Sequence, residues 1–368
     1  MKLLIDGHLD LAWNAASHDR DLTQSLADLN QAESAMTDTA YRGKATITFP
    51  EMRSANLCLC LATLLARSGP EHKLKTQYLR TDLDYSTRIG SFAAAHAQRA
   101  CYTLWEQQGH IRLIHTQADF DDHFSQWSSS NESDASAQTL PLGVILSMEG
   151  ADPITDPDQL PMWHQNGLRA IGPVHYGFGQ YGAGTATDGP LTADGKKLLQ
   201  NMQHLNMGLD VTHLCDRSME EALDLYEGTV WASHHNCRSL VPGDRQINDD
   251  QIKRVISKGG VIGAASDAWM LKAGWKIGST VAGELKIDSV VDHIDHVCQL
   301  AGNTDHSAIG TDLDGGFGTE QTPSDLKSYT DQQRLAGILS SRGYSDEDVE
   351  KIFNRNWLRV LRAVLPQA

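Results

Sequence analysis

Short apolar segments recur along the whole chain, and segments of helical character lie between many of them. The eight segments that resemble buried strands are residues 3–5, 57–61, 142–146, 170–173, 208–211, 230–232, 261–264 and 307–310. Helical stretches between them include residues 86–108, 196–205, 218–226 and 290–300. Strands that alternate with helices favour a parallel sheet wrapped by helices, and eight of them fit a closed (β/α)8 TIM barrel.

The remaining segments are expected to surround such a barrel. Residues 14–41 are polar and lack a clear period, which predicts an irregular insertion after the first strand. Residues 346–364 are expected to form a terminal helical region that covers the barrel. Because the sequence contains no internal repeat and no typical interdomain linker, residues 1–368 are expected to form a single α/β domain with loop insertions.

Charge and cysteine usage limit the partners and the compartment. With 47 acidic against 31 basic residues, the formal net charge is −16, which would repel nucleic acids and anionic membranes. No apolar run approaches the roughly 20 residues of a membrane span. The six cysteines include no C-x-x-C pair, so buried free thiols are favoured over disulfides. Unless a leader has been removed ahead of Met1, these features predict a cytoplasmic protein.

Residues that can bind metal follow several of the expected strands. His8 and Asp10 are two positions apart, so their side chains would project to one face and could hold the same ion. Glu149 follows the strand at residues 142–146, and its two carboxylate oxygens could bridge two cations. The carboxyl ends of barrel strands are where active sites form. Either motif alone is more often a satisfied or solvated side chain than a ligand.

Further strand ends carry residues of the same kind. His213 and His234 each follow a short strand, and neutral imidazole is a preferred zinc ligand. His235 would point to the opposite face, so His234 is the preferred candidate. Asp312 ends the last strand beside a glycine-rich turn, and Asp314 is a second candidate whose direction depends on that turn. The combination of strand ends, rather than any single residue, indicates a metal centre.

The order of these residues resembles the membrane (renal) dipeptidase family, which belongs to the amidohydrolase-like barrels. Other stretches similar to that family are Leu191-Thr192-x-x-Gly195, Asn206-Met207-Gly208-Leu209-Asp210-Val211-Thr212-His213, Arg245-Gln246-Ile247 and Asn356-Trp357-Leu358-Arg359-Val360. The matches extend from residue 3 to about residue 364, so they cover nearly the whole chain. The resemblance therefore implies a barrel of the metal-dependent hydrolase type.

The resemblance also implies a binuclear zinc site. His8 and Asp10 would bind the first zinc ion, His213 and His234 the second, and Glu149 would bridge the two. Two Zn²⁺ per chain are expected, with other divalent metals as alternatives. The zinc pair would supply the hydroxide that attacks a peptide carbonyl.

Three more residues match family positions that act on the substrate. His175 matches the substrate-side histidine, which could hydrogen-bond the developing oxyanion. Arg245 matches the arginine that holds the free carboxylate of a dipeptide. Asp312 matches the catalytic aspartate, which would take a proton from water and pass it to the leaving amine. Without the resemblance, His175 reads as a loop histidine and Arg245 as a surface arginine.

Two loops depart from the family pattern. Tyr176 stands where the family usually has asparagine, and it begins a glycine-rich loop at residues 177–184. After the seventh strand, residues 264–266 are Ala-Ala-Ser in place of an Asn-aromatic pair, and Trp269 and Trp275 follow. Because loops at the catalytic face select substrates, an atypical pocket above a complete set of metal ligands is expected.

The function expected from the resemblance is hydrolysis of small dipeptides, including those with a D-residue at the C-terminal position. The altered loops leave open a binuclear zinc amidase, deacylase or lactonase that acts on another small molecule and scarcely needs Arg245. A non-enzymatic metal-binding barrel is disfavoured because all five ligands and Asp312 are retained. Relatives are commonly homodimers, so a homodimer is a further expectation.

Overall fold

The computed structural model describes residues 1–69, 83–130, 139–280 and 283–367, and eight parallel strands in them form a nearly closed barrel. The strands follow the order β1-β2-β6-β7-β8-β9-β10-β11. Their bounds are β1 Leu4–Leu9, β2 Leu57–Leu65, β6 Leu142–Glu149, β7 Leu168–Gly172, β8 Gly208–Asp210, β9 Val230–Ala232, β10 Val261–Ala264 and β11 Ser307–Ile309. Each segment predicted to be a strand is one of these, so the TIM barrel is confirmed.

Every residue of these eight strands is buried. Burial on both faces is expected of a parallel sheet that encloses a packed interior and is covered by helices outside. A short strand β5 (Ile111–Leu113) pairs with β6 outside the barrel order. The strands β3 (Arg67–Ser68) and β4 (Asp84–Tyr85) form a separate two-stranded sheet.

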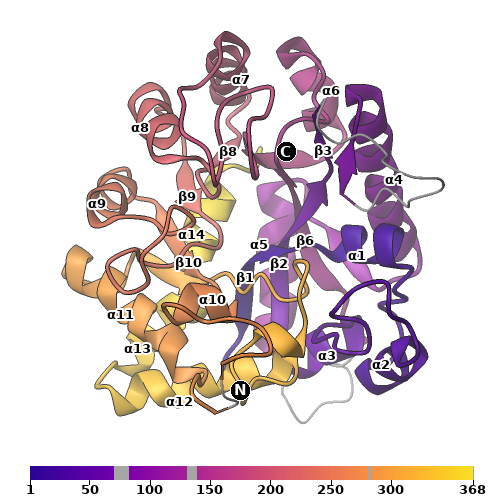
Figure 1. Cartoon of the computed structure of the whole chain (residues 1–368), viewed down its shortest axis with the longest axis vertical. Helices are drawn as coiled ribbons and strands as arrows, with labels where there is room; N and C mark the ends of the chain where they lie inside the picture. Colours follow the sequence, from indigo (N-terminus) through magenta and orange to yellow (C-terminus); the bar gives the residue numbers. More distant parts are fainter. Residues whose placement is uncertain (70–82, 131–138, 281–282, 368) are drawn as a thin grey trace.

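Helices form a ring around the strands (Figure 1). The ring includes α4 Arg88–Gln107, α6 Leu160–Gln165, α7 Ala193–His204, α8 Asp216–Leu225, α9 Asp249–Ser257 and α11 Asp288–Ala301. The four predicted helical stretches correspond to α4, α7, α8 and α11. Helix α9 was not predicted, although a capping box between Asn248 and Gln251 marks its beginning.

The prediction of irregular structure at residues 14–41 was wrong in part. Helix α1 (Leu11–His18) extends into this segment and α2 (Leu26–Glu33) lies within it. Buried charged residues interrupt the apolar period of this segment. Glu33 accepts hydrogen bonds from Arg20 Nε at 2.9 Å and from Arg42 Nη1 at 2.7 Å. All three side chains are buried, so charge pairing takes the place of an apolar face.

A buried carboxylate joins the first and last strands. Among the described residues no backbone ladder connects β1 with β11. Instead, Asp6 Oδ1 accepts from the Thr311 N–H at 2.9 Å, and Asp6 Oδ2 accepts from Thr311 Oγ1 at 2.6 Å. The Tyr329 hydroxyl also donates to Asp6 Oδ2 at 2.6 Å. These bonds hold the ends of β1 and β11, from which His8 and Asp312 emerge.

Two glycines allow the strands to approach closely beneath the catalytic face. A Cβ atom at Gly263 would lie 2.0 Å from the Ser233 carbonyl oxygen, and one at Gly310 would lie 1.8 Å from it. Neither distance is possible for real atoms, so any side chain would force these strands apart. The absence of side chains here lets the residues that follow β9 and β11 converge.

The C-terminal region closes the other end of the barrel. It contains α12 (Arg334–Ser341), α13 (Asp346–Glu350), a π-helical turn (Lys351–Arg355) and α14 (Asn356–Ala363). The side-chain amides of Asn354 and Asn356 donate to the carbonyls of Leu3 and Ser307, both at 2.8 Å, at the amino-terminal ends of β1 and β11. The expected helical cover over the barrel is therefore confirmed.

The six cysteines are all free thiols, as expected, and five of them are buried. Within the described residues, no helix is both long and apolar enough to cross a bilayer.

Candidate active site

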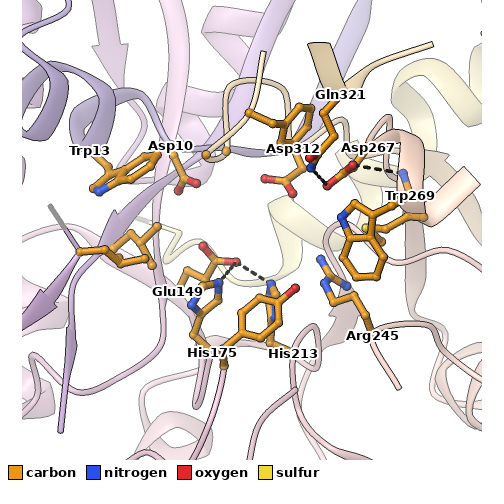
Figure 2. Close-up of a pocket in the computed structure, with 17 residues that line it drawn as sticks. Asp10, Trp13, Glu149, His175, His213, Arg245, Asp267, Trp269, Asp312 and Gln321 are labelled. Carbon is orange, nitrogen blue, oxygen red and sulfur yellow. Dashed lines mark hydrogen bonds and ion pairs between the residues drawn. The ribbon is translucent and has the colours of Figure 1, made fainter. Parts of the chain in front are cut away.

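The predicted site residues meet at the carboxyl-terminal ends of the barrel strands (Figure 2). His8 lies in β1 and Glu149 is the last residue of β6. The others follow a strand within three residues: Asp10 follows β1, His175 follows β7, His213 follows β8, His234 follows β9 and Asp312 follows β11. Six strands thus contribute to one site, which is where a TIM barrel builds its catalytic centre.

His8, Asp10, Glu149, His213 and His234 form what we term the ligand cluster. It contains two overlapping groups of three whose ligand-type atoms lie within 4.8 Å of one another: His8–Asp10–Glu149 and Glu149–His213–His234. Glu149 belongs to both. Its Oε2 lies 3.6 Å from His8 Nε2, and its Oε1 lies 3.2 Å from His213 Nε2 and 3.3 Å from His234 Nε2. Each carboxylate oxygen therefore faces a different group.

Hydroxyl groups outside the ligand cluster orient three of its members. Ser233 Oγ lies 2.8 Å from His234 Nδ1, and Thr185 Oγ1 lies 3.1 Å from His213 Nδ1. Both Nε2 atoms are then left facing Glu149, since the other ring nitrogen is engaged. Thr63 Oγ1 hydrogen-bonds Asp10 Oδ1, the oxygen that lies 3.6 Å from His8 Nε2.

The glycine-rich loop after Tyr176 explains how Thr185 reaches His213. The loop folds back on itself through bridges between Phe178 and Ala183 and between Tyr176 and Thr185. Sequence reasoning identified this loop as a departure from the family but did not identify Thr185, because a lone threonine carries no signal before the loop is folded.

Two site residues are among the seven non-glycine residues of the described chain that have positive φ. His213 has φ +69° and Asp312 has φ +56°, a left-handed conformation that non-glycine residues rarely adopt. Such strain persists only where the surroundings hold it, and it is common at functional sites. Both residues lie three positions after a barrel strand, β8 for His213 and β11 for Asp312.

Burial and close charges together shift the pKa values at the ligand cluster. Burial raises the pKa of Asp312 well above its ordinary value, and the negative charges of Asp10 and Glu149 raise it further. Burial acts to lower the pKa of His8, but Glu149 and Asp10 outweigh it and raise that pKa well above its usual range. Burial acts to raise the pKa of Glu149, but the neighbouring His8 and His175 hold it well below its ordinary value.

The residues present fit divalent metal ions. His8 Nε2 is buried without a hydrogen-bond partner among the described residues, and the nearest carboxylate oxygens lie 3.6–3.8 Å from it. Burial keeps the pKa values of His213 and His234 well below the ordinary value, so both imidazoles are neutral, as zinc ligands must be. Neutral imidazoles and converging carboxylates form a donor set suited to zinc.

Arg245 and His175 also face this site, although neither was identifiable without the resemblance. Arg245 is only 2% exposed; its Nη2 donates to the His234 carbonyl at 3.1 Å, while Nη1 has no partner in the described part of the chain. His175 Nε2 lies 3.8 Å from Glu149 Oε1, and burial lowers the pKa of His175 to about 4.

The second-choice ligand candidates lie elsewhere. His235 does not belong to any group of ligand-type atoms found in the described residues. Asp314 turns away and accepts from the Thr46 N–H at 2.9 Å and from Thr46 Oγ1 at 2.6 Å, so it anchors a neighbouring loop. The preferences for His234 and Asp312 agree with this arrangement.

A cavity of about 200 Å³ opens above the ligand cluster, and its two sides differ (Figure 2). Trp13, which lies beside Asp10, and three further apolar residues of the lining, Leu65, Leu83 and Phe317, form what we term the apolar wall. Tyr176, Arg245, Asp267, Trp269 and Gln321 form what we term the polar wall. Asp267 and Gln321 were not identified from the sequence, because they lie in loops whose side chains carry no periodic signal.

Comparisons with known proteins agree with this geometry. The model of the membrane dipeptidase family, peptidase family M19, matches residues 1–367. An uncharacterized Klebsiella pneumoniae protein from the pqqA 5′ region is 30% identical over 61% of this chain and 83% of its own length. Dipeptidase tcpJ from Claviceps purpurea is 27% identical over 60% of this chain, and the match spans only 52% of that protein.

The fold is shared with a solved metallopeptidase from Rhodobacter sphaeroides, whose structure holds a phosphinate mimic of the dipeptide L-Ala-D-Ala. The two chains are 20% identical, with a TM-score of 0.73 and coverage of 99% of this chain and 100% of that one. Because the family model matches essentially the whole described chain, the protein is an enzyme of the membrane dipeptidase family of metallopeptidases, peptidase family M19.

Proposed function

We propose that the protein is a binuclear zinc dipeptidase that hydrolyses small dipeptides, including those with a D-residue at the C-terminal position. The observation that carries this proposal is the position of Glu149 between two groups of ligand-type side chains, with one oxygen toward each. His8 and Asp10 would hold one ion, His213 and His234 the other, and Glu149 both. The L-Ala-D-Ala mimic held by the Rhodobacter sphaeroides metallopeptidase supports the stereochemical part.

Zinc ions bound there would supply Lewis-acid activation of the scissile carbonyl and of water. Asp312 carries the proton: its carboxylate accepts a proton from the attacking water and donates it to the leaving amine nitrogen as the C–N bond breaks. Its Oδ1 lies 3.8 Å from His8 Nε2, so the proton is transferred beside the ligand cluster. His175 is placed to donate a hydrogen bond to the oxygen that gains charge in the transition state.

Arg245 would bind the free carboxylate of the substrate. Arg245 lines the cavity, its buried Nη1 has no partner among the described residues, and a planar guanidinium suits a carboxylate. Because Arg245 lines the same cavity as Glu149 and His213, a substrate whose free carboxylate lies close to the scissile bond, as in a dipeptide, would suit it. The small volume of the cavity also favours a dipeptide, because a longer peptide would need more space.

Hydrolysis of a panel of L,L- and L,D-dipeptides by zinc-loaded protein tests the proposal. We expect cleavage that falls about 10³-fold in kcat in Asp312→Asn, with the zinc content unchanged. The absence of cleavage by wild-type protein that binds two zinc ions would contradict the dipeptidase activity. It would favour an amidase, deacylase or lactonase, to which the altered loops around Tyr176 and Asp267 also point.

A further inference from the structure

A buried carboxylate and a buried guanidinium belong to the polar wall and do not pair with each other. Figure 2 shows Arg245 and Asp267 on the same side of the cavity, with Trp269 beside them. Arg245 is 2% exposed and Asp267 is 5% exposed. No ion pair joins them within the part of the chain that the structure describes, and Arg245 Nη1 remains without a partner. Both groups are therefore available to something that enters the cavity.

The protein holds the Asp267 carboxylate with donors. Gln321 Nε2 donates to Asp267 Oδ2 at 3.1 Å, and the Trp269 N–H donates to Oδ1 at 3.4 Å. A carboxylate can accept about four hydrogen bonds and Asp267 lines the cavity, so it keeps capacity for a further donor. A carboxylate so placed disfavours a second anion or an apolar group against it, and it favours a cation or a hydrogen-bond donor.

We propose that Asp267 is a specificity-determining residue that selects dipeptides whose C-terminal residue carries a cationic or donor side chain, with lysine as the representative. This inference rests on the proposed function. Arg245 would take the α-carboxylate, and Asp267, on the same wall, would take the side chain of the same residue. The polar wall would then match a C-terminal residue that carries both a negative and a positive group, and the apolar wall would receive the N-terminal residue of the dipeptide.

A purely structural role would explain less of the geometry. Asp267 also caps α10 (Ala268–Leu271) through the Trp269 N–H. Capping needs one oxygen, which asparagine or serine would supply equally well. It does not require the second oxygen to bond Gln321, nor a carboxylate on the wall of the cavity beside Arg245.

The test compares kcat/KM for L-Ala-L-Lys, L-Ala-L-norleucine and L-Ala-L-Glu with zinc-loaded wild-type protein and variants. Lysine and norleucine differ essentially by the ammonium group, so their ratio isolates the side-chain contact. We expect the wild type to prefer the lysine dipeptide about tenfold or more, mainly through KM, and to disfavour the glutamate dipeptide. In Asp267→Asn the preference for lysine should fall to about one.

Two further variants separate recognition from folding. Asp267→Ser keeps a capping oxygen and should lose the lysine preference as well. Asp156→Asn changes another aspartate that caps a short helical turn, at Pro157–Gln159, and does not line this cavity, so its ratio should equal that of wild type.

The outcomes distinguish this inference from the proposed function. Wild-type protein that cleaves the lysine and norleucine dipeptides equally well, or a lysine preference that survives in both Asp267 variants, would overturn the inference and leave the dipeptidase intact. Failure of metal-loaded wild type to cleave any L,L- or L,D-dipeptide would overturn both.

Discussion

The ligand cluster and the polar wall face the same cavity but are held in place differently. Members of the ligand cluster lie in or directly after buried strands, and hydroxyls such as those of Thr185 and Ser233 fix their rings. The polar wall is built from loops and the four-residue helix α10. Its most exposed member, Tyr176, has 38% of its surface accessible.

This difference suggests that the ligand cluster serves the reaction and that the polar wall serves substrate selection. Strand ends bonded on several sides tolerate little displacement, as metal coordination requires. Loops can change sequence without disturbing the barrel, so they vary the substrate above a constant reaction. Here Tyr176 and Trp269, two of the positions at which the sequence departs from the family pattern, lie on the polar wall, whereas the ligand cluster retains its full set of residues.

Replacement of the shared carboxylate is the strongest way to break the ligand cluster. We expect Glu149→Gln to lower kcat/KM for dipeptides by about 10⁴-fold or more, because both metal positions lose an anionic ligand. Zinc content by mass spectrometry should fall in parallel, with the helical circular dichroism unchanged. A variant that keeps two zinc ions and most of its activity would remove Glu149 from its bridging role.

Replacement of Arg245 tests the polar wall. We expect Arg245→Met to lower kcat/KM roughly 10- to 100-fold, mainly by raising KM, because a charge-assisted hydrogen bond to the substrate carboxylate is lost. Arg238→Met is the matched control, since Arg238 pairs with Asp216 outside the cavity. An unchanged KM in Arg245→Met would favour the amidase or lactonase alternative.

Removal of a hydroxyl behind the ligand cluster should have a smaller effect. We expect Ser233→Ala to weaken zinc binding about tenfold, because the hydrogen bond that fixes His234 Nδ1 is lost. Competition with a chelator measures this change. Ser239→Ala, whose hydroxyl contacts His296 away from the cavity, should bind zinc as wild type does. Equal zinc affinities in both variants would show that the outer hydroxyls do not orient the cluster.

The smallest expected effect is the pH dependence of selectivity, which tests whether the polar wall selects substrates through the charge of Asp267. Burial raises the pKa of Asp267 to about 7, and the positive charge of Arg245 on the same wall acts to lower it. Asp267 is thus protonated below this value and ionised above it. The ratio of kcat/KM for lysine over norleucine dipeptides should therefore rise several-fold from pH 6 to pH 8, as the carboxylate becomes charged. Tyr176 and Asp312 face the same cavity, but their titration affects both substrates.

The sequence predicted all eight strands but ended some too early. Residues 3–5 and 142–146 were read as strands, whereas β1 continues to Leu9 and β6 to Glu149. The predicted strands ended before Asp6 and Ser147, where a polar residue interrupts the apolar run, and the proposed ligands His8 and Glu149 lie in the strand ends that were missed. Burial at the barrel end is a tertiary effect, so local periodicity cannot reveal it.

Site residues could be predicted where a metal-binding residue type stands at the end of a predicted strand, and not elsewhere. His8, Glu149, His213 and His234 carry that double signal, and the structure brings them together. Asp267 and Gln321 have no such signal, because they meet only when the loops after β10 and β11 fold over the cavity.

The most direct test of the central claim is to locate bound zinc by anomalous X-ray scattering in crystals of zinc-loaded protein. We expect two peaks, one beside His8 and Asp10 and one beside His213 and His234, with Glu149 touching both. A single peak, or two peaks of which one lies away from Glu149, would contradict a binuclear centre at this barrel end.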